Sequence, residues 1–188
     1  MLLGEIARLR AQHDLADRVG RQHRELAYTD PLTGLANRRA WDDALAAIRS
    51  APVTEKHGWC LAIVDLDRFK GVNEAHGLAA GDQLLQEVAA ALSAALRQQD
   101  LVSRLGGDEF GVLLSNVTPK EAATILERLR SAVARRSRSE LTTDLTASIG
   151  YVVTTDGAAE PSKLFSVAER ALRAAKRSGG NQVILGTA

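Results

Sequence analysis

Residues 104–110 read Arg-Leu-Gly-Gly-Asp-Glu-Phe, and apolar segments lie on both sides of them. Residues 101–102 precede the two glycines, and the apolar run 110–114 follows them. This pattern predicts a strand, a tight turn and a second strand over about 101–115, with two carboxylates at the tip. Adjacent carboxylates at a turn are costly unless a cation lies near them, and a divalent metal is the natural candidate. Taken alone, the turn is better explained by acids that face water, so its meaning depends on the rest of the chain.

The bulk composition narrows the classes of protein to which this chain can belong. The 188 residues are 45% hydrophobic, which predicts one compact domain with an appendage. The net charge of +1 provides no basic field for nucleic acid. The single cysteine, Cys60, lies in an apolar run, which indicates a buried thiol and no disulfide framework. No apolar run reaches the about 18 residues of a membrane span, and no signal peptide is visible, so we expect a cytoplasmic protein.

The chain divides into an N-terminal helix and one domain. Residues 1–29 lack proline and carry spaced apolar side chains, which favours a coiled-coil-like stalk, and an amphipathic helix packed on its own domain is the alternative. The domain is expected over 30–188. Besides the hairpin, we predict helices over about 38–50, 80–97, 119–136 and 160–177, and strands over about 58–66, 144–154 and 181–186. Such an order is typical of an α/β or α+β fold with a mixed sheet flanked by helices.

A second acidic cluster follows the strand predicted at 58–66. Residues 65–70 read Asp-Leu-Asp-Arg-Phe-Lys, and the strand before them is almost wholly apolar, as in the centre of a sheet. Asp65 and Asp67 share one face if the strand continues that far. Carboxylates at a strand end, opposite acids on a hairpin, are typical of a metal site for phosphoryl transfer. No Walker A or Gly-x-Gly-x-x-Gly sequence occurs, which excludes a P-loop or Rossmann nucleotide site.

With these two clusters in place, the chain resembles the GGDEF domain family, the diguanylate cyclases. The signature of that family is similar to residues 104–110, and the resemblance extends over about 28–188. Four further motifs match the family in the same order: Asp30-Pro31-Leu32-Thr33-Gly34-Leu35-Ala36-Asn37-Arg38-Arg39, Asp65 to Lys70 with Asn73, Gly81 and Asp82, Ser148-Ile149-Gly150, and Ala174-Ala175-Lys176.

The resemblance implies a fold, a reaction and partners. The fold is a palm-like nucleotide-cyclase core with a five-stranded mixed central sheet. The reaction joins two GTP into cyclic di-GMP and releases two pyrophosphates. Each protomer holds one GTP, so two domains must meet face to face, and a homodimer through the N-terminal helix is expected. An upstream sensory domain, which this sequence does not include, is also expected.

The resemblance also assigns roles to single residues. Asp65, Asp108 and the backbone carbonyl of Leu66 would hold Mg²⁺ or Mn²⁺, two ions per GTP. Either Asp108 or Glu109 would serve as general base. The residues that would contact the substrate are Arg68, Phe69, Lys70 and Lys176 at the phosphates, and Asn73 and Asp82 at the guanine. Asp82 is alternatively explained as a helix N-cap after Gly81.

A product-inhibition motif of the family, Arg-x-x-Asp, matches Arg97 and Asp100 just before the hairpin. An arginine fork suits a phosphate or a guanine edge, and a carboxylate accepts from guanine. Arg128 is the candidate for a second arginine of that site. The basic run at 135–138 is interpreted as a solvated helix end.

Three positions depart from the family pattern. Glu74 replaces the usual Asp, Leu78 replaces the usual His, and Gly180 stands where the family has an arginine for the terminal phosphates. One lost charge-assisted contact costs about 1.5–3 kcal/mol. We therefore expect an active but weak cyclase, and the alternative is a degenerate domain that binds GTP or cyclic di-GMP without efficient catalysis.

Overall fold

The structure, a computed structural model, describes residues 27–48, 57–136, 145–155 and 160–187. The predicted stalk over 1–29 lies almost wholly outside these ranges. The helices are α2 (Arg38–Ile48), α3 (Phe69–His76), α4 (Leu78–Ala94), α5 (Pro119–Arg136) and α6 (Pro161–Arg177). The strands are β1 (Gly58–Asp67), β2 (Leu101–Gly106), β3 (Glu109–Val117), β4 (Thr146–Thr154) and β5 (Val183–Leu185).

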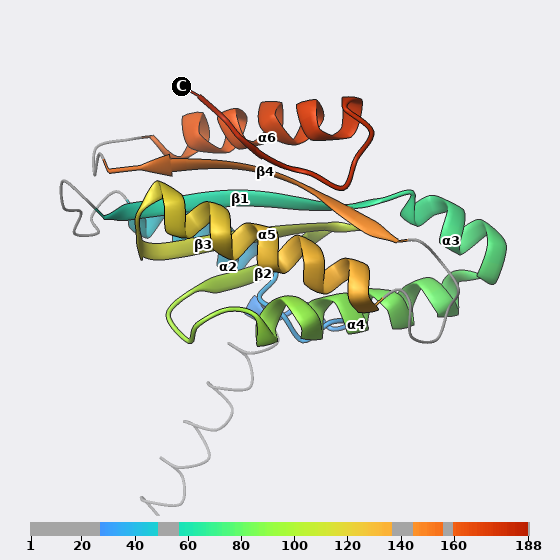
Figure 1. The fold of residues 1–188 in the computed structure, drawn as a ribbon. Coiled ribbons are helices and arrows are strands. Elements are labelled where there is room, and N and C mark those ends of the chain that lie inside the picture. The colour runs from blue at the N-terminus through green and yellow to red at the C-terminus, as the bar shows by residue number, and fades with distance from the viewer. Residues whose placement is uncertain (1–26, 49–56, 137–144, 156–159, 188) are drawn as a thin grey trace, which may run out of the picture.

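The five strands form one mixed sheet in the order β2-β3-β1-β4-β5 (Figure 1). β1 pairs antiparallel with β3 and with β4, and β4 pairs parallel with β5. The apolar strand is therefore central, as the sequence predicts, and the five-stranded mixed sheet with flanking helices is confirmed.

β1 is apolar along its whole length because both of its faces are covered. Cys60, Ala62 and Val64 belong to a core that α4 and α5 complete. Leu61 and Ile63 point to the opposite face and belong to a second core with α2 and α6. This alternation has the period of two expected of a strand. In Figure 1, α6 lies above β4, and α5 crosses in front of the central strands.

Local capping signals set where two helices begin. The side-chain oxygen of Asn37 accepts a hydrogen bond from the backbone N–H of Ala40 at 3.1 Å, so the predicted cap of α2 is confirmed. Before α5, Glu121 accepts from the backbone and hydroxyl of Thr118, and the Glu121 N–H donates back to the Thr118 hydroxyl. This reciprocal capping box explains why the start predicted for α5 is correct.

The region between β1 and the hairpin differs from the prediction. The sequence does not predict α3, and α4 covers 78–94 rather than 80–97. α3 has eight residues with a glycine inside, so its sequence carries little helical signal. Its burial of Phe69 and Val72 in the core and its packing against α4 stabilise it instead.

α6 lies directly on β4 because a glycine lets the two backbones approach. A Cβ at Gly150 would come within 2.1 Å of the Leu172 nitrogen and 2.2 Å of the Ala168 oxygen. Only glycine therefore fits this position without a shift of the helix. The close packing brings the last turn of α6, which carries Lys176, to the end of β1.

Candidate active site

The two acidic clusters meet where β1 ends beside the β2–β3 hairpin. Asp65 lies directly opposite Glu109 in the antiparallel register of β1 and β3. One residue further, the Leu66 N–H donates to the Asp108 carbonyl at 3.3 Å. The structure thus brings together Asp65, Leu66, Asp108 and Glu109, which the sequence assigned to one site.

Arg104 stabilises the conformation of the acidic turn by contacts with Gly107 and Asp30. Its guanidinium donates to the Gly107 carbonyl at 2.8 and 3.0 Å and pairs with Asp30 at 3.2 Å. The turn itself needs glycine, since Gly107 has φ +54°. Asp30 also accepts from the backbone and hydroxyl of Thr33. These contacts link the segment that follows residue 29 to the residue before Asp108.

Asp30 and Arg104 both lie in motifs that match the family, but the sequence suggested no role for either. Burial alone would raise the pKa of Asp30, but hydrogen bonds from Thr33 and Arg104 outweigh it and lower the pKa. The only sequence signal for this ion pair was that Asp30 and Arg104 carry opposite charges and lie in two of the matching motifs. Their separation of 74 residues hid the pairing.

Asp67 points to the same side of β1 as Asp65, as predicted, but its carboxylate is occupied by structural hydrogen bonds. It accepts from the hydroxyls of Thr146 and Ser148, each at 2.7 Å, and from the Asn181 backbone N–H at 2.8 Å. Burial acts to raise the pKa of Asp67, but these donors outweigh it and lower the pKa. Asp67 therefore ties β1 to β4 and to the loop after α6.

Lys176 places an ammonium among the carboxylates. Its Nζ is paired with Asp65 Oδ1 and lies 3.2 Å from Asp67 Oδ1 and 3.3 Å from the Leu66 carbonyl oxygen. Burial would lower the pKa of Lys176, but the pairs with Asp65 and Asp67 raise it. The sequence expected Lys176 at the phosphates, and the structure adds this contact with the acids.

The acids at this site are not fully neutralised by the protein. Burial raises the pKa of Asp65 despite the pair with Lys176, and the carboxylates of Asp108 and Asp67 raise it further. Glu109 is exposed, but partial desolvation raises its pKa, together with the charges of Asp65, Asp108 and Glu169. Desolvation is the larger cause of both shifts, and the neighbouring carboxylates add to it, so a bound cation would stabilise the charged forms of Asp65 and Glu109.

The donor set fits a hard divalent cation. Carboxylate and carbonyl oxygens from Asp65, Asp108 and Leu66 are the ligands that Mg²⁺ prefers, and Mg²⁺ usually completes its shell with water and substrate phosphate. Among the described residues, no group of three or more His, Cys, Asp or Glu side chains could hold a metal ion alone.

Apart from Lys176, the residues expected at the phosphates lie at the start of α3. Arg68 adopts φ +61° just before the helix, and Lys70 is exposed and 3.6 Å from Glu74. The Phe69 side chain is buried in the core, so only its backbone can face a ligand. The backbone N–H groups at the start of a helix suit an anion.

The residues expected at the guanine lie where α3 and α4 pack together. A Cβ at Gly81 would come within 1.8 Å of Asn73 Oδ1, so the Asn73 amide lies against the backbone beside Asp82. Asp82 is exposed. It does not cap α4, because the helix begins at Leu78 with Gly77 as its N-cap residue, and that alternative is wrong.

Gly180 borders the site from the far side of Asp67. It has φ +77°, and a Cβ built on it would lie 3.0 Å from the Asp67 carboxylate. An arginine here would need both the left-handed backbone and a shift of Asp67.

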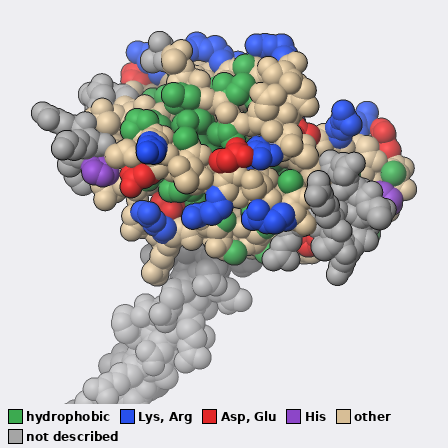
Figure 2. All heavy atoms as spheres, in the orientation of Figure 1, with side chains coloured by type: hydrophobic (Ala, Val, Ile, Leu, Met, Phe, Trp, Pro, Cys, Tyr) green, Lys and Arg blue, Asp and Glu red, His purple; other side chains and the backbone are tan. Residues whose placement is uncertain are grey.

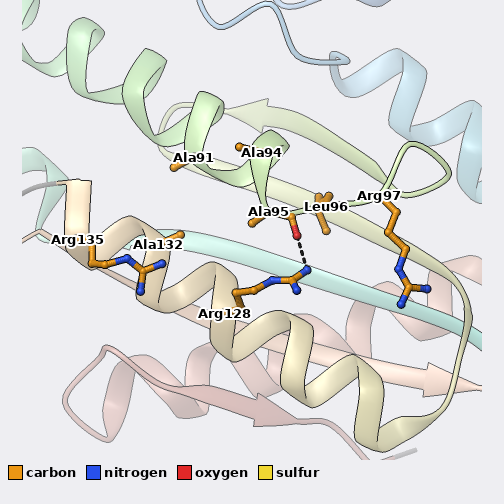
Figure 3. Close-up of a pocket in the computed structure, with 8 residues that line it drawn as sticks. All are labelled: Ala91, Ala94, Ala95, Leu96, Arg97, Arg128, Ala132 and Arg135. Carbon is orange, nitrogen blue, oxygen red and sulfur yellow. Dashed lines mark hydrogen bonds between the residues drawn. The ribbon is translucent and has the colours of Figure 1, made fainter.

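A cavity lies between the end of α4 and α5, away from the acids (Figure 3). Its volume is about 660 Å³, and its walls combine small apolar side chains with arginines: Ala91, Ala94, Ala95, Leu96, Arg97, Arg128, Ala132 and Arg135. Arg128 donates to the Ala95 carbonyl at 2.5 Å. Figure 2 shows basic side chains in a row across this face of the molecule.

The two named residues of the Arg-x-x-Asp motif have different positions relative to this cavity. Arg97 and Arg128 line the cavity together, whereas Asp100 does not line it. The Asp100 carboxylate accepts from the backbone N–H groups of Arg97 and Ser115 at 3.1 and 3.4 Å, so it fixes the loop that presents Arg97. Arg135, interpreted from sequence as part of a solvated helix end, lines the cavity as well.

Comparisons with known proteins agree with this geometry. The family described as "Diguanylate cyclase, GGDEF domain" matches residues 27–182. The probable diguanylate cyclase DgcT of Escherichia coli is 36% identical over 166 residues, which cover 86% of this chain and 36% of that protein. The chain spans less than half the length of the curated relatives that it matches.

Two solved structures are similar over nearly the whole chain. The crystal structure of the coiled coil and GGDEF domain of DgcB from Caulobacter crescentus, in complex with c-di-GMP, has a TM-score of 0.87 and 30% identity, and the match covers 98% of this chain and 99% of that one. The diguanylate cyclase SiaD from Pseudomonas aeruginosa, in complex with its activator SiaC, has a TM-score of 0.77 and 32% identity, with 98% and 72% covered. In the described part of this chain, no helix is both long enough and apolar enough to span a membrane.

The hydrogen bonds to Asp67 predict a pH-dependent loss in the variant Asp67→Asn. The lowered pKa means that this carboxylate stabilises the fold fully above the ordinary value of 3.8, and that the contribution is lost as pH falls through the lower folded value. We expect the variant to unfold about 1–3 kcal/mol more easily at pH 7. In urea titrations the difference should persist at pH 4.5 and shrink at pH 3.

The matched control is Asp42→Asn, which removes an acid from an exposed pair with Arg38 on α2. It should cost less than about 0.5 kcal/mol. A deficit for Asp67→Asn that stays the same from pH 7 to pH 3 would show that the charge of Asp67 is not its source.

Proposed function

We propose that this chain, which belongs to the GGDEF domain family, is a diguanylate cyclase that condenses two GTP into cyclic di-GMP and releases two pyrophosphates. The observation that carries the proposal is the meeting of Asp65 with the Asp108–Glu109 turn at the end of β1. Two carboxylates and a carbonyl, with an excess of negative charge around them, are what a cation-dependent phosphoryl transfer requires.

Asp65, Asp108 and the Leu66 carbonyl would hold the divalent ions, Mg²⁺ or Mn²⁺ and two for each GTP. When bound, such ions lower the pKa of the attacking 3′-hydroxyl and neutralise charge on the leaving pyrophosphate. Asp108 and Glu109 are both candidates for the group that takes up the hydroxyl proton. The backbone of Asp108 is hydrogen-bonded to Leu66, and Glu109 lies opposite Asp65. Both acids are therefore near the positions proposed for the metal ions.

The remaining residues would bind and orient the nucleotide. The α3 start, with the backbone of Arg68 and Phe69 and the side chain of Lys70, would contact the phosphates, as would Lys176. Asn73 and Asp82 would read the guanine edge, because a carboxylate can accept from the N1–H and the N2 amine. Adenine lacks both donors, so the site would favour GTP over ATP.

The reaction needs two protomers, since each site holds one GTP. We therefore propose a homodimer whose two sites face one another, set by the N-terminal helix. Activity per protomer should then rise with protein concentration.

The proposal predicts that the chain makes cyclic di-GMP from GTP and Mg²⁺ and leaves ATP unused. Asp108→Asn should reduce the rate by more than about a hundredfold, because it removes a proposed metal ligand. Asp42→Asn, which removes an equal charge on α2, should keep the wild-type rate. Product is measured by chromatography at several protein concentrations.

One observation favours a second candidate, a degenerate domain that binds without efficient catalysis. Gly180 supplies no cation to the terminal phosphates, and an arginine there would strain the loop against Asp67. GTP binding without product at high protein concentration would support this alternative. Absence of binding to both GTP and cyclic di-GMP would contradict both functions.

We propose that the cavity between α4 and α5 is a product-inhibition site. Arg97 and Arg128 line it from two elements, Asp100 fixes the loop of Arg97, and Arg135 extends the basic lining. Guanidinium forks match phosphate oxygens and guanine edges, and the small alanines leave space for bases.

Removing one arginine should weaken this inhibition. In Arg97→Ala, the cyclic di-GMP concentration that halves the rate should rise about ten- to a hundredfold, the equivalent of one lost charge-assisted contact. Arg135→Ala should change it in the same direction. Lys120→Ala removes a charge from α5 outside the cavity and should leave inhibition unchanged. Equal inhibition of all variants would place the inhibitory site elsewhere.

A further inference from the structure

The Lys176 ammonium contacts the same atoms to which the proposed function assigns a metal ion. Nζ is paired with Asp65 Oδ1 and lies 3.3 Å from the Leu66 carbonyl oxygen. Asp67 Oδ1, at 3.2 Å, completes the contacts. The ammonium offers these carboxylate and carbonyl oxygens a positive charge and hydrogen-bond donors. It therefore takes the place that a hard cation would otherwise occupy.

A divalent ion would compete with the ammonium for these oxygens. A divalent ion bound by Asp65 and Leu66 would lie against the ammonium, and the like charges would repel one another in a partly buried setting. The Lys176 and Asp65 side chains are 34% and 22% exposed, so water screens such repulsion only in part.

We infer that Lys176 is a built-in counter-ion that excludes the divalent ion from Asp65 until nucleotide phosphates draw the ammonium away. This inference rests on the proposed function and adds an order of events to it: the metal enters together with the nucleotide rather than before it. The long side chain of a lysine with its rotatable donors suits an ammonium that changes partners from carboxylate to phosphate.

Metal binding to the nucleotide-free protein tests the inference. Free Mn²⁺ is followed by electron paramagnetic resonance at pH 8 during titration of wild type, Lys176→Met and Lys176→Arg. Loss of the competing charge in Lys176→Met should tighten Mn²⁺ binding about three- to tenfold. Lys176→Arg keeps the charge and should stay within about twofold of wild type.

A matched charge variant separates exclusion at Asp65 from a general effect of charge. Arg177→Met removes an equal charge from the next residue of α6 and should leave the affinity unchanged, because no contact joins Arg177 to Asp65 among the described interactions. If Arg177→Met tightens Mn²⁺ binding as much as Lys176→Met does, the tighter binding comes from the change in overall charge, and the inference fails. Thermal unfolding verifies that each variant is folded, and Lys176→Gln replaces Lys176→Met if that variant is not.

The outcomes also distinguish this inference from the proposed function. Adding Asp65→Asn to the Lys176→Met variant should abolish its Mn²⁺ binding. Retained binding in this double variant would contradict the metal site itself. If the added Asp65→Asn abolishes binding but Lys176→Met binds Mn²⁺ no more tightly than wild type, the result still supports the metal site. Lys176 then orients Asp65 for the ion, and the exclusion is overturned.

Discussion

The end of β1 concentrates more negative charge than the surrounding side chains neutralise, and the rest of the site follows from that constraint. Asp65, Asp67 and Asp108 converge there, and Lys176 pairs with the first two. Asp67 is stabilised by three hydrogen bonds, whereas Asp65 keeps a raised pKa. The cluster therefore divides into one structural acid, Asp67, and acids that a metal ion could bind once Lys176 leaves Asp65.

The fold supplies that charge through backbone pairing rather than through local contacts. β1 lies between β3 and β4, so its end meets the hairpin on one side and the Thr146–Ser148 hydroxyls on the other. Arg104 holds the Gly107 carbonyl and Asp30 together, which fixes the turn in front of Asp108.

Much of this arrangement could be predicted from the sequence, because it depends on local patterns. The apolar run of β1, the glycine turn and the capped start of α5 each carry their own signal. α3 could not be predicted, since tertiary packing rather than propensity stabilises it. The Asp30–Arg104 and Lys176–Asp65 pairs join residues 74 and 111 positions apart, and the place of Arg135 in the cavity depends on how α4 and α5 pack.

A crystal structure of the chain with Mn²⁺ and a GTP analogue that cannot react tests the account most directly. The anomalous signal of manganese locates the ions without reference to any assumed role. The account predicts manganese in contact with Asp65, Asp108 and the Leu66 carbonyl, and Lys176 on the phosphates. Manganese bound to the nucleotide but away from Asp65 and Asp108 would contradict it.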